Sequence, residues 1–452
     1  MKDHETALLI PNEILEAAEG LENDLKDKLC KLSIQDNALT IAKFVIALQN
    51  EDNISLNYKT NLIRALIKLS KIVNKKFSDM TREDLLSFLN SLRKTEEKDP
   101  LHKWIGTHSQ YILVLSRFFR WLYYPGLPKK ERPKPAVLDN IRKLVRREKS
   151  IYKPTDLWTQ DDDLLFLKYC PSKREKCYHV ISRDTSCRPH EILNLRLKDV
   201  VFKLAGDRQY AEVLVNGKTG SRSIPLIDSI PYVKDYLDDH PQRSNPNPNA
   251  YLIFGMGKSF GKKCNRSLYI NIYRNYKKVF FPKLLQDPKV SPEDKVKIKE
   301  LLKKPWNPYI RRHSALTEKS KILKEHILRQ HAGWSPNSSM HLKYLHYFGN
   351  ESSESILEAY GIKPKSEEID KMKPKQCPKC SEPNQIESKF CVKCRMILCY
   401  NEYLGSIENQ KQKENEIVEI KNEISLMKEG QKELLELLKN PTQLFEILHK
   451  DQ

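Results

Sequence analysis

The sequence contains no run of about 18 consecutive apolar residues, the length that a helix needs to cross a bilayer. Its N-terminal segment also lacks the basic start, apolar stretch and small-residue cleavage site of a secretory signal. The ten cysteines do not resemble a disulfide framework, because four stand in two C-x-x-C pairs and the other six are scattered. These absences argue against a membrane or secreted protein. We expect a cytoplasmic protein without disulfide bonds.

The sequence is strongly basic. It holds 79 lysines and arginines against 59 aspartates and glutamates, a formal net charge of +20 over 452 residues. Such an excess suits a phosphate backbone, which releases its counterions when cationic side chains bind. The same composition also fits a protein that is basic for solubility or because its genome favours lysine codons. Charge therefore makes nucleic acid the first partner to consider, but only the motifs can distinguish a nucleic-acid-binding protein from one that is merely basic.

The length and the residue pattern predict several folded units. Residues 1–125 carry apolar positions at intervals of three and four, as at Leu62, Leu66 and Leu69, which predicts an all-α domain. Residues 126–155 contain several prolines among many lysines and arginines. This composition predicts a basic linker, extended in part, which is suited to lie along DNA.

Residues 156–362 mix helical patterns with one region of strands. The segments 199–204, 210–215 and 222–226 alternate or run apolar, and the turn sequence NGKTG at 216–220 joins the last two. Helical patterns then resume at 271–285, 291–302 and 317–330. We predict a mainly α fold with a small antiparallel β-sheet, in which an all-α domain precedes an α+β domain.

Four cysteines near the C-terminus have the spacing of a metal site. Cys377-x-x-Cys380 and Cys391-x-x-Cys394 are separated by ten residues. Two such thiolate pairs form a closed tetrahedral Zn²⁺ site, which can replace the core that so short a segment cannot build. We predict a zinc ribbon over residues 374–400 with one structural Zn²⁺, and free cysteines of a reducing compartment are the alternative. Nearby lysines suggest DNA as the ribbon's partner without excluding protein.

The segment 405–450 carries a heptad pattern, in which apolar positions alternate at intervals of three and four. These positions are Ile417, Ile420, Ile424, Met427, Leu434 and Leu438. The pattern spans only about three heptads before Pro441. We predict an amphipathic or coiled-coil helix, which either self-associates or docks on the protein's own surface.

Residues 185–195 (TSCRPHEILNL) place Pro189 at the first position of a predicted helix, directly after Arg188 and two residues before Glu191. An Arg–Glu pair with this spacing is also common on helix surfaces. The segment resembles the first conserved box of the tyrosine recombinases, in which an arginine binds the scissile phosphate and an acidic residue orients it. Lys218, in the predicted hairpin turn, falls where this family carries its catalytic lysine, although lysines in glycine-rich turns are usually just solvated.

Residues 308–315 (PYIRRHSA) are similar to the family's H-x-x-R-H box. Arg312 aligns with the second catalytic arginine and is followed by His313, and Arg311 is the competing assignment. Tyr309 replaces the usual histidine, and a tyrosine cannot titrate near neutrality.

Residues 333–346 (GWSPNSSMHLKYLH) look like the family's last box. Trp334 takes the His-or-Trp position, and Tyr344, ten residues on, takes the position of the nucleophile. Tyr347 is the nearest alternative. This form resembles archaeal integrase-like members of the family in particular.

The resemblance implies a site-specific recombinase or integrase that cleaves and rejoins DNA through a 3′-phosphotyrosyl bond to Tyr344. Arg188 and Arg312 stay protonated and neutralise a phosphate without a metal ion, so neither ATP nor a catalytic metal is required. Lys218 is expected to act as the general acid, and Trp334 and Tyr309 to pack against the phosphate or hydrogen-bond to it. Glu191 and His313 are expected to support these side chains from behind. The sequence does not identify the base that deprotonates Tyr344.

The resemblance also implies the partners. Double-stranded DNA would be clamped between the helical N-terminal core-binding domain and the catalytic domain, with a homo-tetramer assembled on the DNA and the protein associated with the nucleoid. Two alternatives remain open. One is relaxation of DNA supercoils by the same chemistry, as in type IB topoisomerases. The other is a noncatalytic DNA-binding protein that retains the recombinase fold.

Overall fold

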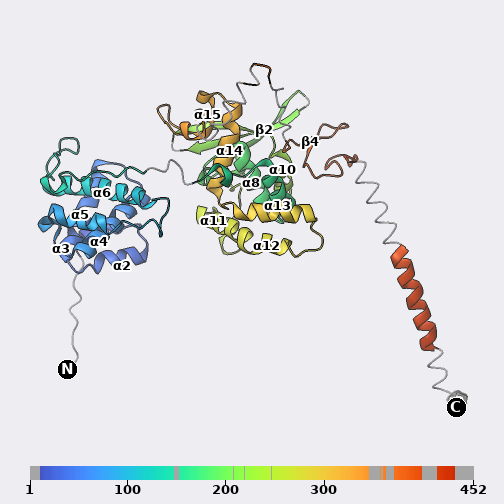
Figure 1. Cartoon of the computed structure of the whole chain (residues 1–452), viewed down its shortest axis with the longest axis horizontal. Helices are drawn as coiled ribbons and strands as arrows, with labels where there is room; N and C mark the ends of the chain where they lie inside the picture. Colours follow the sequence, from blue (N-terminus) through green and yellow to red (C-terminus); the bar gives the residue numbers. More distant parts are fainter. Residues whose placement is uncertain are drawn as a thin grey trace, which may run out of the picture. The chain divides into compact units, whose positions relative to one another are not determined.

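The chain divides into two units, Met1–Ile151 and Tyr152–Gln452 (Figure 1). The computed structural model describes residues 11–146, 152–206, 208–217, 219–245, 247–345, 357, 360–362, 371–399 and 415–432. None of the helices in these ranges is both long enough and apolar enough to span a bilayer. Lys218, the predicted general acid, lies outside the described residues.

Helices build the described part of the N-terminal unit, which contains no strand. They are α1 (Asn12–Ala17), α2 (Asn23–Cys30), α3 (Gln35–Glu51), α4 (Leu56–Val73), α5 (Arg82–Asn90) and α6 (Trp104–Tyr123), with short 3-10 helices η1 (Phe77–Asp79) and η2 (Ala136–Leu138). Helix α5 begins at a capping box, in which Thr81 and Asp84 each bind the other's backbone N–H. Leu62, Leu66 and Leu69 of α4 are fully buried, as their spacing predicts.

Part of the segment predicted as a linker belongs to this unit. Val137 and Leu138 of η2 are buried in the same hydrophobic core as α3, α4 and α6. Residues 136–138 are therefore packed rather than extended, because burial of these two apolar side chains stabilises the folded unit.

The C-terminal unit combines helices with two small sheets. Its helices are α7 (Gln160–Tyr169), α8 (Lys173–Thr185), α9 (Pro189–Ile192), α10 (Ile230–Asp238), α11 (Arg266–Asn275), α12 (Phe281–Leu284), α13 (Pro292–Lys303), α14 (Pro308–Ile322), α15 (Glu325–Ala332) and α16 (Leu342–Leu345). Shorter helical segments are η3 (Pro154–Asp156), η4 (Leu197–Asp199), η5 (Gly257–Ser259) and the π-helix η6 (Tyr276–Phe280). Its strands are β1 (Val200–Ala205), β2 (Arg208–Gly217), β3 (Gly220–Leu226), β4 (Lys375–Gln376) and β5 (Pro383–Asn384).

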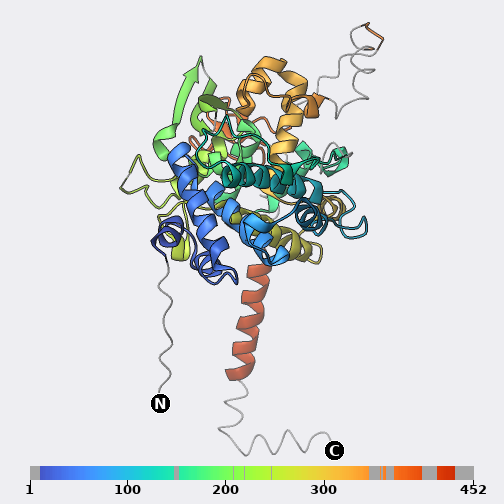
Figure 2. The same cartoon turned by 90° about the vertical axis from the view of Figure 1, so that its left-hand side faces the viewer.

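Strands β1, β2 and β3 form an antiparallel sheet in this order. The register pairs Val200 with Val213 and Ala211 with Leu226. Alternate residues of β2, namely Ala211, Val213 and Val215, are fully buried, as expected where one face of a sheet covers a core. Helix α15 contacts β3, and it lies next to the strands in Figure 1 and Figure 2. These features confirm the predicted mainly α fold with a small antiparallel sheet.

One predicted helix is wrong in its extent. The sequence pattern favours a single helix over residues 317–330, but α14 ends at Ile322 and α15 begins at Glu325. Leu323 and Lys324 adopt extended backbone angles between the two helices. The break turns α15 back against α14, which closes the wall of the site described below.

The segment 371–399 is docked on the C-terminal unit. Met372 is fully buried in the core that contains α7, α8 and α10. Glu382 forms an ion pair with Lys234 of α10, and Gln385 Nε2 donates a hydrogen bond to Asp235 of the same helix at 3.2 Å. Residues 415–432 form a separate helix whose described side chains are all exposed. Its heptad residues between 417 and 427 therefore have no partner among the described residues, and Leu434 and Leu438 lie outside them.

Candidate active site

A cavity of ≈ 540 Å³ in the C-terminal unit brings the four motifs together. It is lined by Arg188, Thr219, Tyr309, Arg312, His313, Gly333, Trp334, Ser335, Ser338, Met340 and Tyr344. Five of the six residues predicted to be catalytic are in this set. Lys218, the sixth, is outside the described residues, but its neighbour Thr219 lines the cavity and donates a hydrogen bond to the carbonyl of Gly333 at 3.2 Å.

The chain turns sharply to present Arg188. Helix α8 ends at Thr185, and the next residue, Ser186, has a left-handed backbone (φ 49°). Helix α9 begins at Pro189, directly after Arg188. The guanidinium of Arg188 donates to Glu191 Oε1 at 3.0 Å and to the carbonyl of Gly333 at 3.3 Å. Its side chain is still 27% exposed. Arg188 is thus oriented on one side and open to a ligand on the other.

Glu191 holds two arginines at once. Its side chain is fully buried and accepts hydrogen bonds from Arg188 and, at 2.9 Å, from Arg222 Nη2. Burial alone would raise the pKa of Glu191, but the hydrogen bond from Arg222, the backbone N–H of Arg188 and both guanidinium charges lower it below its usual value. Glu191 is therefore a carboxylate that fixes Arg188 near neutral pH.

Arg222 is a residue of the site that sequence reasoning missed. It lies on β3 and also donates to the carbonyl of His331 at 3.1 Å, so it links the hairpin to α9 and to the end of α15. A Cβ at Gly333, where φ is +63°, would lie 2.6 Å from Arg222 Nη1, so this close approach requires glycine. A signal was present, because Arg222 shares the buried face of β3 with Ile224 and Leu226.

The two neighbouring arginines of α14 point to different places. Arg311 is 1% exposed and forms an ion pair with the fully buried Asp163 at 2.9 Å. Asp163 also contacts His179 Nε2 at 2.8 Å, so Arg311 belongs to a buried ionic cluster. Arg312 instead lines the cavity and donates to the carbonyls of Ser186 and, at 2.9 Å, Ala332.

Arg312 faces the same cavity as Arg188, and the two charges repel. Burial lowers the pKa of Arg312 most, and the charge of Arg188 lowers it further. An anion in the cavity would relieve this repulsion, and two guanidiniums can bind two oxygens of a phosphate through paired N–H groups. The electrostatics of the cavity therefore favour an oxyanion such as a phosphodiester.

Tyr344 lies between two other rings of the site. Its ring is 5.4 Å from that of Trp334 and 5.7 Å from that of His313, with interplanar angles of 24° and 25°. Its hydroxyl lies 3.0 Å from His313 Nδ1. Only 4% of Tyr344 is exposed, because Leu316 and Leu328 complete a small apolar cluster around it. The hydroxyl is held at the cavity beside the two arginines.

Tyr309 lies at the cavity as well. Its hydroxyl accepts a hydrogen bond from Arg266 Nη1 at 3.1 Å, and the same guanidinium lies 5.6 Å from the centre of the Tyr309 ring. Arg266 is exposed at the start of α11, and sequence reasoning missed it because nothing in its local pattern marks it.

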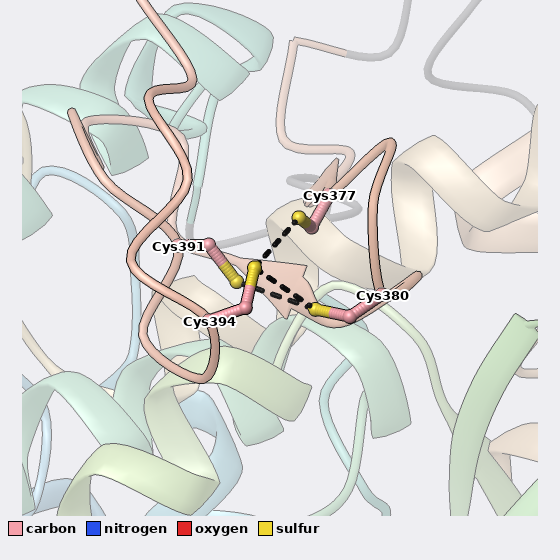
Figure 3. Close-up of side chains that lie close together, drawn as sticks. All are labelled: Cys377, Cys380, Cys391 and Cys394. Carbon is pink, nitrogen blue, oxygen red and sulfur yellow. Dashed lines mark hydrogen bonds between the residues drawn. The ribbon is translucent and has the colours of Figure 1, made fainter.

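Four cysteines form a separate cluster in the segment 371–399 (Figure 3). All four Sγ atoms lie within 4.8 Å of one another. The separations are 3.5 Å between Cys377 and Cys394 and 3.6 Å between Cys380 and Cys391. Four thiolates bound to one ion at the usual Zn–S length of about 2.3 Å would lie about 3.8 Å apart. The cluster can therefore hold one metal ion without rearrangement.

Comparisons with known proteins give a likeness to solved recombinase structures. No family model matches the sequence, and no curated protein matches it significantly. The XerH site-specific recombinase bound to palindromic difH substrate is 15% identical with a TM-score of 0.49, covering 77% of this chain and 94% of that chain. The Tn1549 transposon integrase in complex with transposon right end DNA is 14% identical with a TM-score of 0.43, covering 71% and 99%. A lambda integrase tetramer bound to a Holliday junction is 11% identical with a TM-score of 0.44, covering 68% and 76%.

Proposed function

We propose that this protein is a site-specific DNA recombinase or integrase of the tyrosine recombinase type, which forms a 3′-phosphotyrosyl bond through Tyr344. One observation carries the proposal: the cavity joins the guanidiniums of Arg188 and Arg312 to a tyrosine hydroxyl. These three side chains come from the residue that precedes α9, from α14 and from α16. A protein that only binds DNA needs no nucleophile beside paired phosphate ligands.

The two arginines act on the scissile phosphate. Its nonbridging oxygens remain negative as phosphorus becomes five-coordinate, so fixed positive charges lower the barrier mainly by positioning and charge stabilisation. Arg188 is oriented by Glu191 and Arg312 by two backbone carbonyls, so neither guanidinium must reorganise when DNA binds. Trp334 and Tyr309 complete the wall around the phosphate.

Tyr344 attacks the phosphorus and displaces the 5′ oxygen of the neighbouring nucleotide. The covalent intermediate conserves the energy of the phosphodiester, so a DNA hydroxyl can later reverse the step without ATP. Lys218 protonates the leaving oxygen as the general acid. Thr219, which follows Lys218 in the sequence, lines the cavity, and this supports the role.

Other parts of the chain would bind DNA, a metal ion or further copies of the chain. The helical N-terminal unit and the C-terminal unit would hold double-stranded DNA together, and copies of the chain would assemble as a tetramer on it. The four cysteines hold one structural Zn²⁺, since thiolate ligands in a closed set favour zinc and leave no open position for catalysis. The helix around residues 415–432 exposes its heptad residues and is available for self-association.

The experiment that tests the proposal is the trapping of a covalent adduct. Full-length protein is incubated with nicked substrates carrying candidate sites from the flanking genome, and the products are separated under denaturing conditions. We expect an adduct on the bound site and exchange of strands between two sites. An adduct with relaxation of any supercoiled DNA and no strand exchange would favour a topoisomerase. No adduct on a site that the protein specifically binds would favour the noncatalytic alternative.

The neighbouring arginines of α14 are expected to give opposite defects. Arg312→Lys keeps the charge but loses the paired N–H groups toward the phosphate, so cleavage should fall by about 10²–10³-fold with a nearly unchanged unfolding midpoint in urea. Arg311→Ala removes a partner of a buried carboxylate and should lower the free energy of unfolding by about 3 kcal/mol. Equal losses of cleavage at equal stability in the two variants would contradict the assignment of Arg312.

A further inference from the structure

The hydroxyl of Tyr344 contacts a ring nitrogen of His313 at the cavity. This contact bears on the step for which the sequence identifies no residue, the removal of the proton from Tyr344. Tyr344 Oη lies 3.0 Å from His313 Nδ1, and both residues line the cavity. We propose that His313 accepts the proton of the Tyr344 hydroxyl as that oxygen attacks the scissile phosphate. The inference rests on the proposed function and adds a catalytic role for His313.

The geometry suits proton transfer. The distance is within the range expected between a general base and the proton that it removes. Tyr344 is 4% exposed and its ring lies 5.4 Å from that of Trp334, so the packing around it restricts the tyrosine while its hydroxyl contacts His313. In the tautomer that carries its hydrogen on Nε2, the imidazole presents a lone pair at Nδ1, and the hydroxyl donates to it.

The charged groups around His313 keep it able to accept a proton. The pKa of His313 is lowered to about 4. Burial is the largest cause, and the positive charges of Arg312 on the same helix and Lys343 on α16 add to it. The ring of Tyr152 packs at 5.1 Å from the imidazole and carries no charge near neutrality. The imidazole is therefore neutral near pH 7. A phosphate bound to Arg312 would offset the charge of that arginine and make His313 more basic when DNA is present.

Tyr309 cannot take this role. It stands where the related motif carries a histidine, but its hydroxyl accepts a hydrogen bond from Arg266 and has no basic lone pair near neutral pH. His313, one turn further along α14, has such a lone pair directed at the nucleophile. The chain thus keeps a base in the cavity at a different position of the same helix.

The step balances in atoms and charge. The bond from Tyr344 Oη to phosphorus forms, and the bond from phosphorus to the 5′ oxygen breaks. The phenolic proton moves to His313 Nδ1, and the 5′ oxygen takes a proton from Lys218. In the rejoining step, the 5′ hydroxyl returns its proton to Lys218 and His313 returns its proton to the phenolate.

The test compares His313→Gln with wild type. Glutamine can still accept a hydrogen bond from Tyr344 but cannot take its proton. We expect cleavage to fall by about 10²–10⁴-fold, while DNA binding and the unfolding midpoint in urea stay unchanged. Between about pH 6 and pH 9 the wild-type rate should stay flat, and the variant rate should rise as hydroxide replaces the missing base.

A modified substrate separates proton removal from proton donation. A 5′-bridging phosphorothiolate leaves as a thiolate and needs no general acid, so it should restore cleavage by Lys218→Ala. It should leave His313→Gln slow, because the phenolic proton must still be removed. His331→Gln is the matched control. His331 is a buried neutral histidine of α15 that does not line the cavity, so the His331→Gln variant should cleave at the wild-type rate.

Three results would overturn the inference. The first is cleavage by His313→Gln at the wild-type rate. The second is recovery of cleavage by His313→Gln on the 5′-bridging phosphorothiolate substrate. The third is a cleavage rate of His313→Gln that stays flat between about pH 6 and pH 9. If His313→Gln does not fold, His313→Ala with added imidazole is measured instead, and rescue that grows with the neutral form of imidazole is expected. Absence of an adduct with wild-type protein would reject the proposed function itself, whereas an adduct with an unaffected His313 variant rejects only this inference.

Discussion

Replacement of Tyr344 by phenylalanine should abolish the covalent protein–DNA adduct, a loss of more than about 10⁴-fold, because the nucleophilic oxygen is removed. Phenylalanine keeps the ring between Trp334 and His313 and the apolar contacts of α16. We therefore expect specific DNA binding and the unfolding midpoint in urea to remain as in wild type. The measurement is the fraction of nicked substrate trapped on the protein, with peptide mapping of the wild-type adduct.

Tyr309→Phe is the matched control, since it removes the same atom from another tyrosine of the same cavity. It loses one hydrogen bond from Arg266, worth about 1 kcal/mol, so cleavage should fall by less than about tenfold and an adduct should still form. Tyr347 lies outside the described residues and needs its own variant. An adduct that persists in Tyr344→Phe and maps to Tyr347 would show that the nucleophile has been assigned to the wrong tyrosine.

The strands could be predicted because their signals are local. Alternation of buried and exposed residues and the NGKTG turn mark β2 and β3, and the antiparallel pairing follows from so short a connection. The break between α14 and α15 has no such signal. Leu323 and Lys324 are ordinary helix formers, and their extended backbone results from the packing of α15 against α14 and β3. Tertiary contacts decide this boundary, and a single sequence does not contain them.

In the site, too, some features follow from local sequence and others from tertiary contacts. The motifs identify which segments hold Arg188, Arg312 and Tyr344, but adjacent residues of a helix point about 100° apart. Which of Arg311 and Arg312 enters the cavity depends on where Asp163 is buried, 148 positions earlier in the chain. The pairing of His313 with Tyr344 likewise joins two motifs across 31 residues. The resemblance to the family's motifs predicts which segments meet at the cavity, and the fold determines which of their side chains enter it.

Removal of the metal is expected to unfold residues 371–399 while the rest of the C-terminal unit stays folded. In the described residues the segment has two strands of two residues each, and its four cysteine Sγ atoms lie within 4.8 Å of one another, where they can bind one ion. Binding of a structural Zn²⁺ is worth about 10–16 kcal/mol, more than such a segment gains from its own packing. The remaining core of the unit, built on α8, α10 and α14, does not depend on the cysteines.

The measurement is metal content per chain, followed by hydrogen exchange before and after chelation. We expect one zinc per chain and loss of protection confined to 371–399 and the surface of α10 that contacts Glu382 and Gln385. Cys380→Ser should lose the metal. Cys399→Ser is the matched control, because Cys399 lies beside Lys375 rather than in the cluster, and it should keep the metal. Unchanged protection after complete removal of the ion would mean that packing on α10 folds the segment and that the cysteines serve another purpose.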